Sequence, residues 1–243
     1  MISSMVEKVS CLDESYIEIK CKDLNFSFRI SEDVRKFFYI AGFSNRLERL
    51  RNEYLISSIL FSDNDIVIDC GANIGEIGLY FRSVSCSVRY YGFEPSLREF
   101  ECCAYNNPGQ NIVNKGLWNE TGDLLFYQKS SQADSSFIEI NDYDYTVEVP
   151  VVRLDEFDIG DGYETIKLLK IEAEGAEPEV IEGARQTLKR VQYVSVDVGA
   201  ERGISHEMTI IPVINALMAQ GFELLDFGYP RFVVLLRNLK LLD

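Results

Sequence analysis

The amino-acid sequence predicts an α/β protein with a mostly parallel sheet and helices on both of its faces. Short apolar runs alternate with helical patterns over most of the chain, and such alternation favours parallel strands joined by helices. The first run, 65–69, leads directly into a turn with Gly71 and Gly75 and then into a helical pattern. The last two runs, 222–227 and 232–237, are separated only by a short turn. Since a short turn joins antiparallel strands, the final strand is expected to be antiparallel.

Two periodicities place the remaining elements of this seven-stranded sheet. Continuous or alternating apolar runs predict strands, and apolar residues three and four apart predict helices. Ser96 follows Pro95 and is expected to cap the helix that it begins, whereas Gly221 is expected to end the last helix. The expected strands are 65–69, 88–93, 111–116, 166–172, 193–198, 222–227 and 232–237, and the expected helices are 75–82, 96–105, 177–188 and 207–220.

A small extension precedes the sheet. Residues 16–20 and 25–30 alternate apolar and polar side chains across a short polar turn, a pattern typical of a β-hairpin. Residues 46–60 have the spacing of an amphipathic helix. We therefore expect a hairpin-and-helix extension over 1–62 and the main domain over 63–243.

A long polar segment interrupts the main domain at residues 130–144, between two additional predicted strands, 124–127 and 146–152. A loop of this length in a compact domain is commonly functional or disordered. Together with the N-terminal hairpin, it is expected to form a lid over the active site.

Charge and composition limit the partners and the cellular location expected for the protein. The formal net charge is −15, which repels phosphate backbones, so nucleic acid is not expected as a partner. The basic cluster of Arg46, Arg49 and Arg51 fits a solvated helix face. No apolar run is long enough to span a membrane. The N-terminal residues lack a signal-peptide pattern, and the six cysteines lack metal-ligand spacing, so a cytoplasmic protein with reduced thiols is expected.

The glycine turn indicates which ligand the domain binds. Gly71, Gly75 and Gly78 do not follow the GxGxxG spacing of dinucleotide-binding proteins. Asp69 instead ends the first strand, and Glu94 ends the second. Carboxylates beside a glycine turn would repel a pyrophosphate but suit a ligand with an amine and a ribose. S-adenosylmethionine is such a ligand.

Several segments, in order along the chain, resemble the FkbM-like family of S-adenosylmethionine-dependent methyltransferases. The resemblance covers roughly residues 50–235 and implies a Rossmann-like class I methyltransferase that methylates a hydroxyl group of a sugar, glycan or secondary metabolite. The matching segments are DCGANIG (69–75), GFEPS (92–96), VPVVRLDEF (149–157), LLKIEAEGAE (168–177) and VIEGA (180–184).

The residues at the glycine turn are assigned to the cofactor. Asp69 is expected to accept a hydrogen bond from the methionine amine, directly or through water; the alternative is a strand-end acid that caps the turn. Gly71 and Gly75 would allow close approach of the ligand, or serve turn geometry alone. Asn73 fits either a contact with the methionine end or a cap of the next helix equally well.

The ribose and adenine are assigned to the next two strand ends. The resemblance implies that Glu94 accepts hydrogen bonds from both ribose hydroxyls, the alternative being a solvated acid. The backbone of Leu117 is expected to line the adenine, while Trp118 is as well explained as a core residue.

The predicted strand 166–172 carries unusual charges at its carboxyl end. Lys170, Glu172 and Glu174 alternate with apolar residues, and buried charges of this kind must be paired or line a wet crevice. The family commonly has aspartate where this chain has Glu172. We assign Lys170, Glu172 and Glu174 to catalysis, and Glu172 also to the cofactor site; a structural ion pair is the alternative.

Methyl transfer to a hydroxyl group requires removal of the hydroxyl proton. Glu172, Glu174 and the single histidine, His206, are candidate bases, although His206 fits a surface position equally well. Glu172 and Asp197 are candidate ligands of a divalent ion such as magnesium. We expect at least one of the three candidate bases to be required for turnover.

Two other functions were weighed. A short-chain dehydrogenase needs a Tyr-x-x-x-Lys pair, and 163–167 and 16–20 match its letters but lie in the wrong context relative to the glycine turn. A non-catalytic ligand-binding or scaffold protein is favoured only by the glutamate at position 172. The sequence selects neither the methyl acceptor nor the oligomeric state, and a homodimer is left open.

Overall fold

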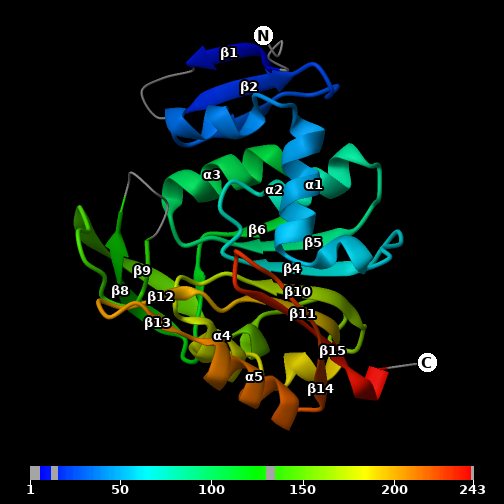
Figure 1. Cartoon of the computed structure of the whole chain (residues 1–243), viewed down its shortest axis with the longest axis vertical. Helices are drawn as coiled ribbons and strands as arrows, with labels where there is room; N and C mark the ends of the chain where they lie inside the picture. Colours follow the sequence, from blue (N-terminus) through cyan, green and yellow to red (C-terminus); the bar gives the residue numbers. More distant parts are fainter. Residues whose placement is uncertain (1–5, 12–15, 130–134, 242–243) are drawn as a thin grey trace.

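A seven-stranded sheet forms the centre of the computed structural model, which describes residues 6–11, 16–129 and 135–241. The strands lie side by side in an order that differs from their order along the chain (Figure 1). Across the sheet they are β14 (Phe222–Phe227), β15 (Val233–Asn238), β11 (Val191–Asp197), β10 (Ile166–Ile171), β4 (Ile66–Cys70), β5 (Arg89–Phe93) and β6 (Asn111–Val113).

The strand directions confirm the predicted sheet. Strands β11, β10, β4, β5 and β6 are mutually parallel. Strand β15 runs antiparallel to both of its neighbours, with Val233 opposite Asp197 on β11. The chain order reverses at β4, which has β10 on one side and β5 on the other. In such sheets the crevice outside the carboxyl ends of these strands is where ligands bind.

Helices cover both faces of the sheet, as the alternation of elements predicted. Helices α1 (Phe43–Glu53), α2 (Glu76–Ser83) and α3 (Leu97–Asn106) lie on one face, and α4 (Glu177–Gly183) and α5 (Ile210–Ala219) on the other (Figure 1). Because successive strand residues point to opposite faces, Val67 belongs to the first hydrophobic cluster, whereas Ile66 and Ile68 belong to the second.

Two predicted helices are shorter than expected. The helix expected over 177–188 ends at Gly183, and a separate 3-10 helix, Thr187–Arg190, follows. The Asp155 carboxylate causes this break, since it accepts hydrogen bonds from the amides of Gln186 and Thr187 at 2.8–3.0 Å. The last helix begins at Ile210 rather than at residue 207, because β13 (Glu207–Met208) pairs with β12 (Ala200–Arg202) instead.

The strand expected over 111–116 divides between two sheets. Strand β6 ends at Val113, and the Asn114 side chain donates hydrogen bonds to the carbonyls of Glu94 and Pro95, both at 2.9 Å. These bonds turn the chain into a second sheet. There β7 (Gly116–Leu117) and β8 (Gly122–Gln128) flank β9 (Tyr145–Val152), which confirms the two additional strands.

The predicted N-terminal hairpin belongs to a three-stranded sheet. Strands β2 (Ile17–Cys21) and β3 (Phe28–Ile30) are antiparallel as expected, and β1 (Val6–Cys11) adds a strand that was not predicted. Helix α1 begins three residues earlier than predicted, because the Asp23 carboxylate accepts hydrogen bonds from the amides of Phe43 and Ser44 at its first turn. It ends before Leu55, which has a left-handed backbone conformation.

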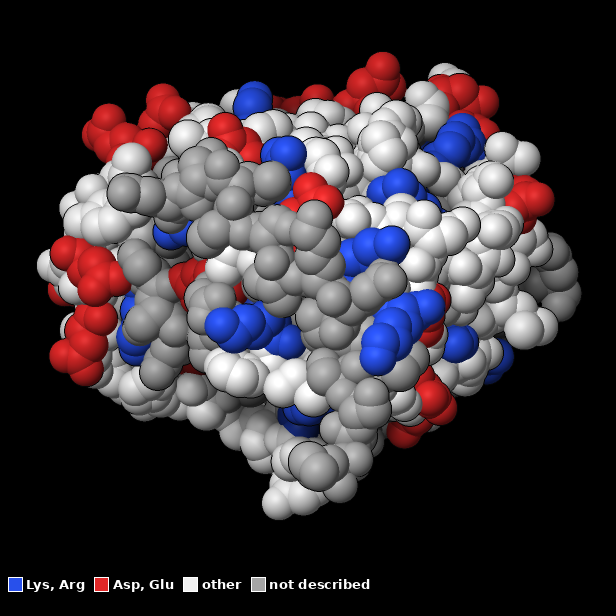
Figure 2. All heavy atoms as spheres, turned by 90° about the horizontal axis from the view of Figure 1, so that it is seen from above, with Lys and Arg blue, Asp and Glu red and all other residues white. Residues whose placement is uncertain are grey.

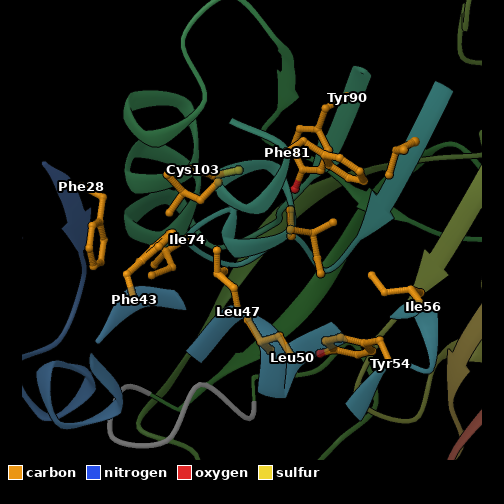
Figure 3. Close-up of a cluster of buried hydrophobic side chains, with 14 of the residues drawn as sticks. Phe28, Phe43, Leu47, Leu50, Tyr54, Ile56, Ile74, Phe81, Tyr90 and Cys103 are labelled. Carbon is orange, nitrogen blue, oxygen red and sulfur yellow. The ribbon is translucent and has the colours of Figure 1, made fainter. Parts of the chain in front are cut away.

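The N-terminal extension packs on α2 and α3, which cover one face of the central sheet. Figure 3 shows Phe28 and Phe43 of the extension in one buried cluster with Ile74, Tyr90 and Cys103 of the main domain. The domain boundary at residue 62 stays a prediction, but the extension and the sheet share this hydrophobic cluster. Within the described part of the chain, no helix has the length and apolar character needed to cross a bilayer.

Candidate active site

A cavity of about 730 Å³ opens at the carboxyl ends of β4, β5 and β10. Its floor includes Asp69 of β4 and Gly71 just after it, Glu94 after β5, Lys170 of β10 and Glu172 just after β10. The extension supplies much of the opposite wall, and residues next to the β8–β9 hairpin close one side. These lining residues include Arg35, Phe38, Arg46, Leu50, Tyr54, Gln128, Lys129, Ser135, Phe137 and Tyr145.

Asp69 is buried and already bonded within the protein. Its Oδ2 accepts a hydrogen bond from the Tyr90 hydroxyl at 2.6 Å, and its Oδ1 lies 2.9 Å from Lys170 Nζ. Lys170 also donates to the carbonyl of Gly71 at 2.8 Å. Burial lowers the pKa of Lys170, but its neighbours, Asp69 first among them, together raise the pKa by more, so the ammonium stays charged. Asp69 and Lys170 therefore fix the end of β4 and the start of the glycine turn.

Gly71 and Gly75 are each required by a different close contact of the backbone. Gly71 has φ +69°, and a Cβ atom there would lie 2.0 Å from the carbonyl oxygen of Glu172. Gly75, with φ +80°, packs against Asn107 and Cys103 of the α3 region and does not line the cavity. Only Gly71 therefore brings backbone to the cavity, and the tight approach at Gly75 is between two helices.

Asn73 and Glu94 join the ends of β4 and β5. The Asn73 amide donates to Glu94 Oε2 at 2.7 Å, and the Ser96 amide donates to Oε1 at 2.9 Å. Burial, and then the charge of Glu99, raise the pKa of Glu94 to about 8. The Asn73 side chain bonds to the amide of Ile74 and does not occupy the N-cap of α2. Ser96 is the N-cap residue of α3 as predicted, but its hydroxyl contacts Gln128 instead of the helix.

Of the two residues expected near the adenine, Leu117 lines the cavity and Trp118 does not. Leu117 is buried and contributes to the wall. Trp118 packs on Phe137 at 5.8 Å between ring centroids, and its carbonyl oxygen lies against Gly183 of α4. Trp118 therefore serves packing, whereas Leu117 lies where the sequence expects the adenine.

Glu172 is the centre of a charged network. Its carboxylate forms a hydrogen bond with Tyr54 and an ion pair with Arg231, and Oε2 lies 3.3 Å from Lys170 Nζ. Arg231 also binds Asp197 Oδ2 through Nε at 2.6 Å. The cations of Lys170 and Arg231 lie 5.0 and 4.8 Å from the centre of the Tyr54 ring, a cation–π distance. The glutamate is thus held in a fixed orientation at the cavity floor.

The proposed metal ligands do not fit a divalent cation. Glu172 and Asp197 are bridged by the Arg231 guanidinium, which supplies the positive charge that a cation would otherwise supply. Burial raises the pKa of Asp197 to about 6. In the described ranges, no cluster of three or more His, Cys, Asp or Glu side chains has an arrangement able to hold a metal ion.

The two other candidate bases lie in different places. Glu174 is half-buried and lines the cavity; its backbone has φ +48°, and its carbonyl accepts a hydrogen bond from Ser136 at 2.8 Å. His206 is exposed in the turn between β12 and β13 and is not among the lining residues. The structure therefore brings Glu172 and Glu174 together at one site and leaves His206 outside it.

Several lining residues had no assigned role in the sequence analysis. Tyr54 lies within the predicted helix 46–60, and Arg231 lies between the last two predicted strands; neither position carries a motif that would assign it a role. Arg46 pairs with Glu76 through two hydrogen bonds, at 2.7 and 2.9 Å, and Glu76 also accepts from Tyr39. Each of these contacts joins residues at least 30 positions apart, so no short motif marks them.

Comparison with known proteins decides the family. Residues 69–226, more than half of the chain, match the family model described as the methyltransferase FkbM domain. The chain belongs to the FkbM methyltransferase family. It is therefore an S-adenosylmethionine-dependent methyltransferase, and the dehydrogenase and scaffold hypotheses are set aside.

Two curated relatives of this FkbM methyltransferase also carry methyltransferase names. The 2-O-methyltransferase NoeI of Sinorhizobium fredii is 23% identical over 234 residues, covering 87% of this chain and 95% of the relative. The hexuronic acid methyltransferase AglP of Haloferax volcanii is 26% identical over 164 residues, covering 64% of this chain and 66% of the relative.

Solved structures resemble this FkbM methyltransferase only distantly. Fibrillarin of Aeropyrum pernix, in complex with S-adenosyl-L-methionine, has a TM-score of 0.40 and 13% identity, covering 95% of this chain and 97% of that one. The Methanococcus jannaschii fibrillarin has a TM-score of 0.42 and 11% identity, covering 96% and 97%.

Proposed function

We propose that this enzyme transfers a methyl group from S-adenosylmethionine to a hydroxyl group of a saccharide. The main support is the cavity at the carboxyl ends of β4, β5 and β10, with the Glu94 carboxylate on its wall beside the glycine turn. One relative is named a 2-O-methyltransferase and the other a hexuronic acid methyltransferase, which favours a sugar hydroxyl over other acceptors. The volume of the cavity, about 730 Å³, is within the range of small-molecule sites.

The cofactor is proposed to lie across the ends of β4, β5 and β7. Glu94 would accept hydrogen bonds from the ribose hydroxyls, because each carboxylate oxygen retains a free lone pair beyond its backbone amide. Gly71 and Asn73 would lie beneath the methionine end, and Leu117 beside the adenine. Asp69, whose oxygens are both engaged, is proposed to act as a positioning residue through Lys170.

The reaction moves one methyl group and one proton. The acceptor oxygen attacks the methyl carbon of the sulfonium, the carbon–sulfur bond breaks as the carbon–oxygen bond forms, and the electron pair stays on sulfur. The hydroxyl proton must then leave the oxygen. We propose Glu174 as its acceptor, since Glu174 lines the cavity and its side chain is only half-buried.

Three single substitutions separate the candidate bases. Glu174→Gln should abolish most turnover while leaving the affinity for S-adenosylhomocysteine unchanged, because only proton removal is lost. Glu172→Gln should lower both turnover and stability through its network, and His206→Ala should retain turnover. Steady-state kinetics and calorimetric binding would measure these effects, and full activity of Glu174→Gln would refute its assignment.

Turnover is proposed to proceed without added metal, because Arg231 neutralises the two carboxylates that were candidate ligands. Dialysis against EDTA should leave the rate unchanged. A rate that falls with EDTA and returns with magnesium would contradict this proposal and restore Glu172 and Asp197 as ligands.

The acceptor class can be tested directly. The purified enzyme would be incubated with S-adenosylmethionine and a panel of neutral sugars, uronic acids and oligosaccharides, with mass spectrometry following S-adenosylhomocysteine and methylated product. We expect a methyl ether on a sugar hydroxyl, with Arg185→Gln, an exposed position outside the cavity, as the matched control. A methyl group found on nitrogen or on a carboxylate would contradict O-methylation.

Two expectations about partners and surroundings stay predictions: a cytoplasmic location and the absence of nucleic acid as a partner. A homodimer stays open. Charge is not spread evenly over the surface. On the face seen from above, Lys and Arg side chains gather toward the middle, and Asp and Glu side chains lie mostly near the rim (Figure 2). Ser135 and Phe137 in the cavity wall support the lid proposed for 130–144, of which 130–134 lie outside the described residues. The described residues of the hairpin 16–30 are not among the lining residues, so the lid role of the hairpin has no such support.

A further inference from the structure

One arginine in the cavity wall has no role in the site described above. Arg35 belongs to the 3-10 helix η1 (Asp33–Tyr39) of the N-terminal extension. Its side chain lines the cavity, yet the residue is only 9% exposed. Removing a guanidinium from water costs several kcal/mol unless partners replace the lost hydration.

The described residues do not supply those partners. Arg35 Nε is buried and makes no hydrogen bond, and no ion pair joins Arg35 to any side chain that the structure describes. Each of the other three arginines with a buried, unbonded Nε has another contact. Arg29 lies 3.7 Å from the ring centre of Tyr105, Arg51 lies 4.7 Å from that of Tyr80, and Arg153 pairs with Asp155 and Glu156. Arg35 has no such ring beneath it among the described aromatic contacts.

Some of the charged side chains near Arg35 already have partners. Glu76 is already paired, since Arg46 and Tyr39 both bond to it. Arg35 helps to lower the pKa of Glu76, and it opposes the burial that raises the pKa of Glu32, so both acids lie within its electrostatic reach. Two more charged groups, Glu99 and Arg98, act on Glu32 as well. Acidic and basic side chains therefore both lie around this guanidinium, so that an amine and a carboxylate of a ligand can each find a partner of opposite charge.

We propose that Arg35 binds a carboxylate group that enters the cavity. This inference rests on the proposed function, because the cavity is taken as the site of cofactor and acceptor. The planar fork of a guanidinium matches the two oxygens of a carboxylate, and such bonds are charge-assisted. Two sources have this chemistry: the amino-acid end of S-adenosylmethionine, whose amine would lie near the acids, and an acidic sugar acceptor.

Binding measurements on the full chain distinguish the two sources. Calorimetry would give the Kd of S-adenosylhomocysteine, the Kd of its decarboxylated analogue, which keeps the amine, and the Kd of glucuronate on protein saturated with S-adenosylhomocysteine. Each would be measured for the wild type, Arg35→Gln, Arg35→Lys and the control Arg49→Gln. Arg49 also lines the cavity, but it is exposed and pairs with Glu53.

Either of two results supports the proposal. If the cofactor supplies the carboxylate, Arg35→Gln weakens S-adenosylhomocysteine about 10- to 100-fold and leaves the decarboxylated analogue unchanged. If the acceptor supplies it, Arg35→Gln loses glucuronate binding and leaves both cofactor analogues unchanged. Arg35→Lys keeps the charge without the fork and should fall between the wild type and Arg35→Gln, whereas Arg49→Gln should match the wild type.

Other results overturn the proposal. Equal weakening of S-adenosylhomocysteine and its decarboxylated analogue would mean that Arg35 only shapes the wall, and no change in any Kd would mean that it binds no carboxylate. A thermal unfolding curve of Arg35→Gln like that of the wild type shows that a loss of affinity is not a loss of fold. A wild type that binds none of the adenosine compounds would instead contradict the proposed function.

Discussion

Replacing Glu94 with glutamine tests whether this carboxylate binds the cofactor in its ionised form. Burial, followed by the charge of Glu99, raises the pKa of Glu94 to about 8 in the free protein. Ribose hydroxyls donate hydrogen bonds best to an ionised carboxylate. Since the proton must leave before those bonds form, the affinity for S-adenosylhomocysteine should rise with pH until the pH passes the pKa.

The pKa sets the size of this effect. The ionised fraction of a group with a pKa of about 8 rises from roughly 1% at about pH 6 to roughly 50% at about pH 8. The Kd of the wild type should therefore fall about 50-fold over that interval and change little above about pH 9. Glu94→Gln has no proton to release, so its Kd should be weaker at high pH and nearly independent of pH.

The unfolding free energy provides a second readout with a definite sign. The folded state keeps the Glu94 proton up to about pH 8, whereas the unfolded chain loses it near the ordinary glutamate pKa of 4.5. Protonated Glu94 therefore stabilises the fold at low pH, and this contribution is lost as the pH rises through that window. Urea denaturation should show this decline in the wild type and a smaller one in Glu94→Gln.

Calorimetric titrations of S-adenosylhomocysteine across this pH range would measure both slopes. Glu99→Gln serves as the matched control, because it removes the neighbouring charge and leaves the hydrogen bonds of Glu94 in place. Without that charge the pKa of Glu94 falls, so the binding curve should move to lower pH. A wild-type Kd that does not vary with pH, or an equal slope in Glu94→Gln, would refute the reasoning.

The remaining predictions concern the fold around the site. Arg231→Met leaves Glu172 and Asp197 without their shared cation and should lower the unfolding free energy by about 2 kcal/mol at neutral pH. Since Asp197 has a pKa of about 6, urea denaturation should show a smaller loss of unfolding free energy near pH 5. A loss that does not depend on pH would contradict the bridge. Gly71→Ala places a Cβ atom 2.0 Å from a carbonyl oxygen and should cost about 3 kcal/mol or more. Its control, Gly109→Ala, has a similar positive φ but no atom within 4 Å and should cost only about 1 kcal/mol; the reverse ranking in urea denaturation would refute the steric argument.

Two of the errors in the predicted elements share one physical cause. The helix expected over 177–188 was broken by the carboxylate of Asp155, which lies 31 residues before the amide of Gln186 that it binds. The strand expected over 111–116 was divided by the side chain of Asn114, which reaches back to the end of β5. Periodicity reports only local preference, and a polar side chain from elsewhere in the chain can override it.

In the candidate site, too, local patterns predicted some residues and missed those that only long-range contacts bring there. Glycine spacing and strand-end acids predicted that Asp69, Gly71 and Glu94 meet at one crevice, because the carboxyl ends of parallel strands share one edge of a sheet. Those local patterns carried no information on Tyr54, which reaches Glu172 across 118 positions of the sequence. They likewise left Arg35 unassigned, since no motif surrounds it.

Sequence patterns alone predicted the fold class, the carboxyl ends of the parallel strands as the ligand-binding edge, and the cofactor, because these depend on periodicity and on short motifs in fixed order. Only the tertiary structure decided which charges act on one another. Arg231 reaches Glu172 and Asp197 because antiparallel β15 lies beside β11, and Arg35 reaches the cavity because the extension packs on α2 and α3. Electrostatic interactions depend on distance in space, and that distance is fixed only when the whole chain is packed.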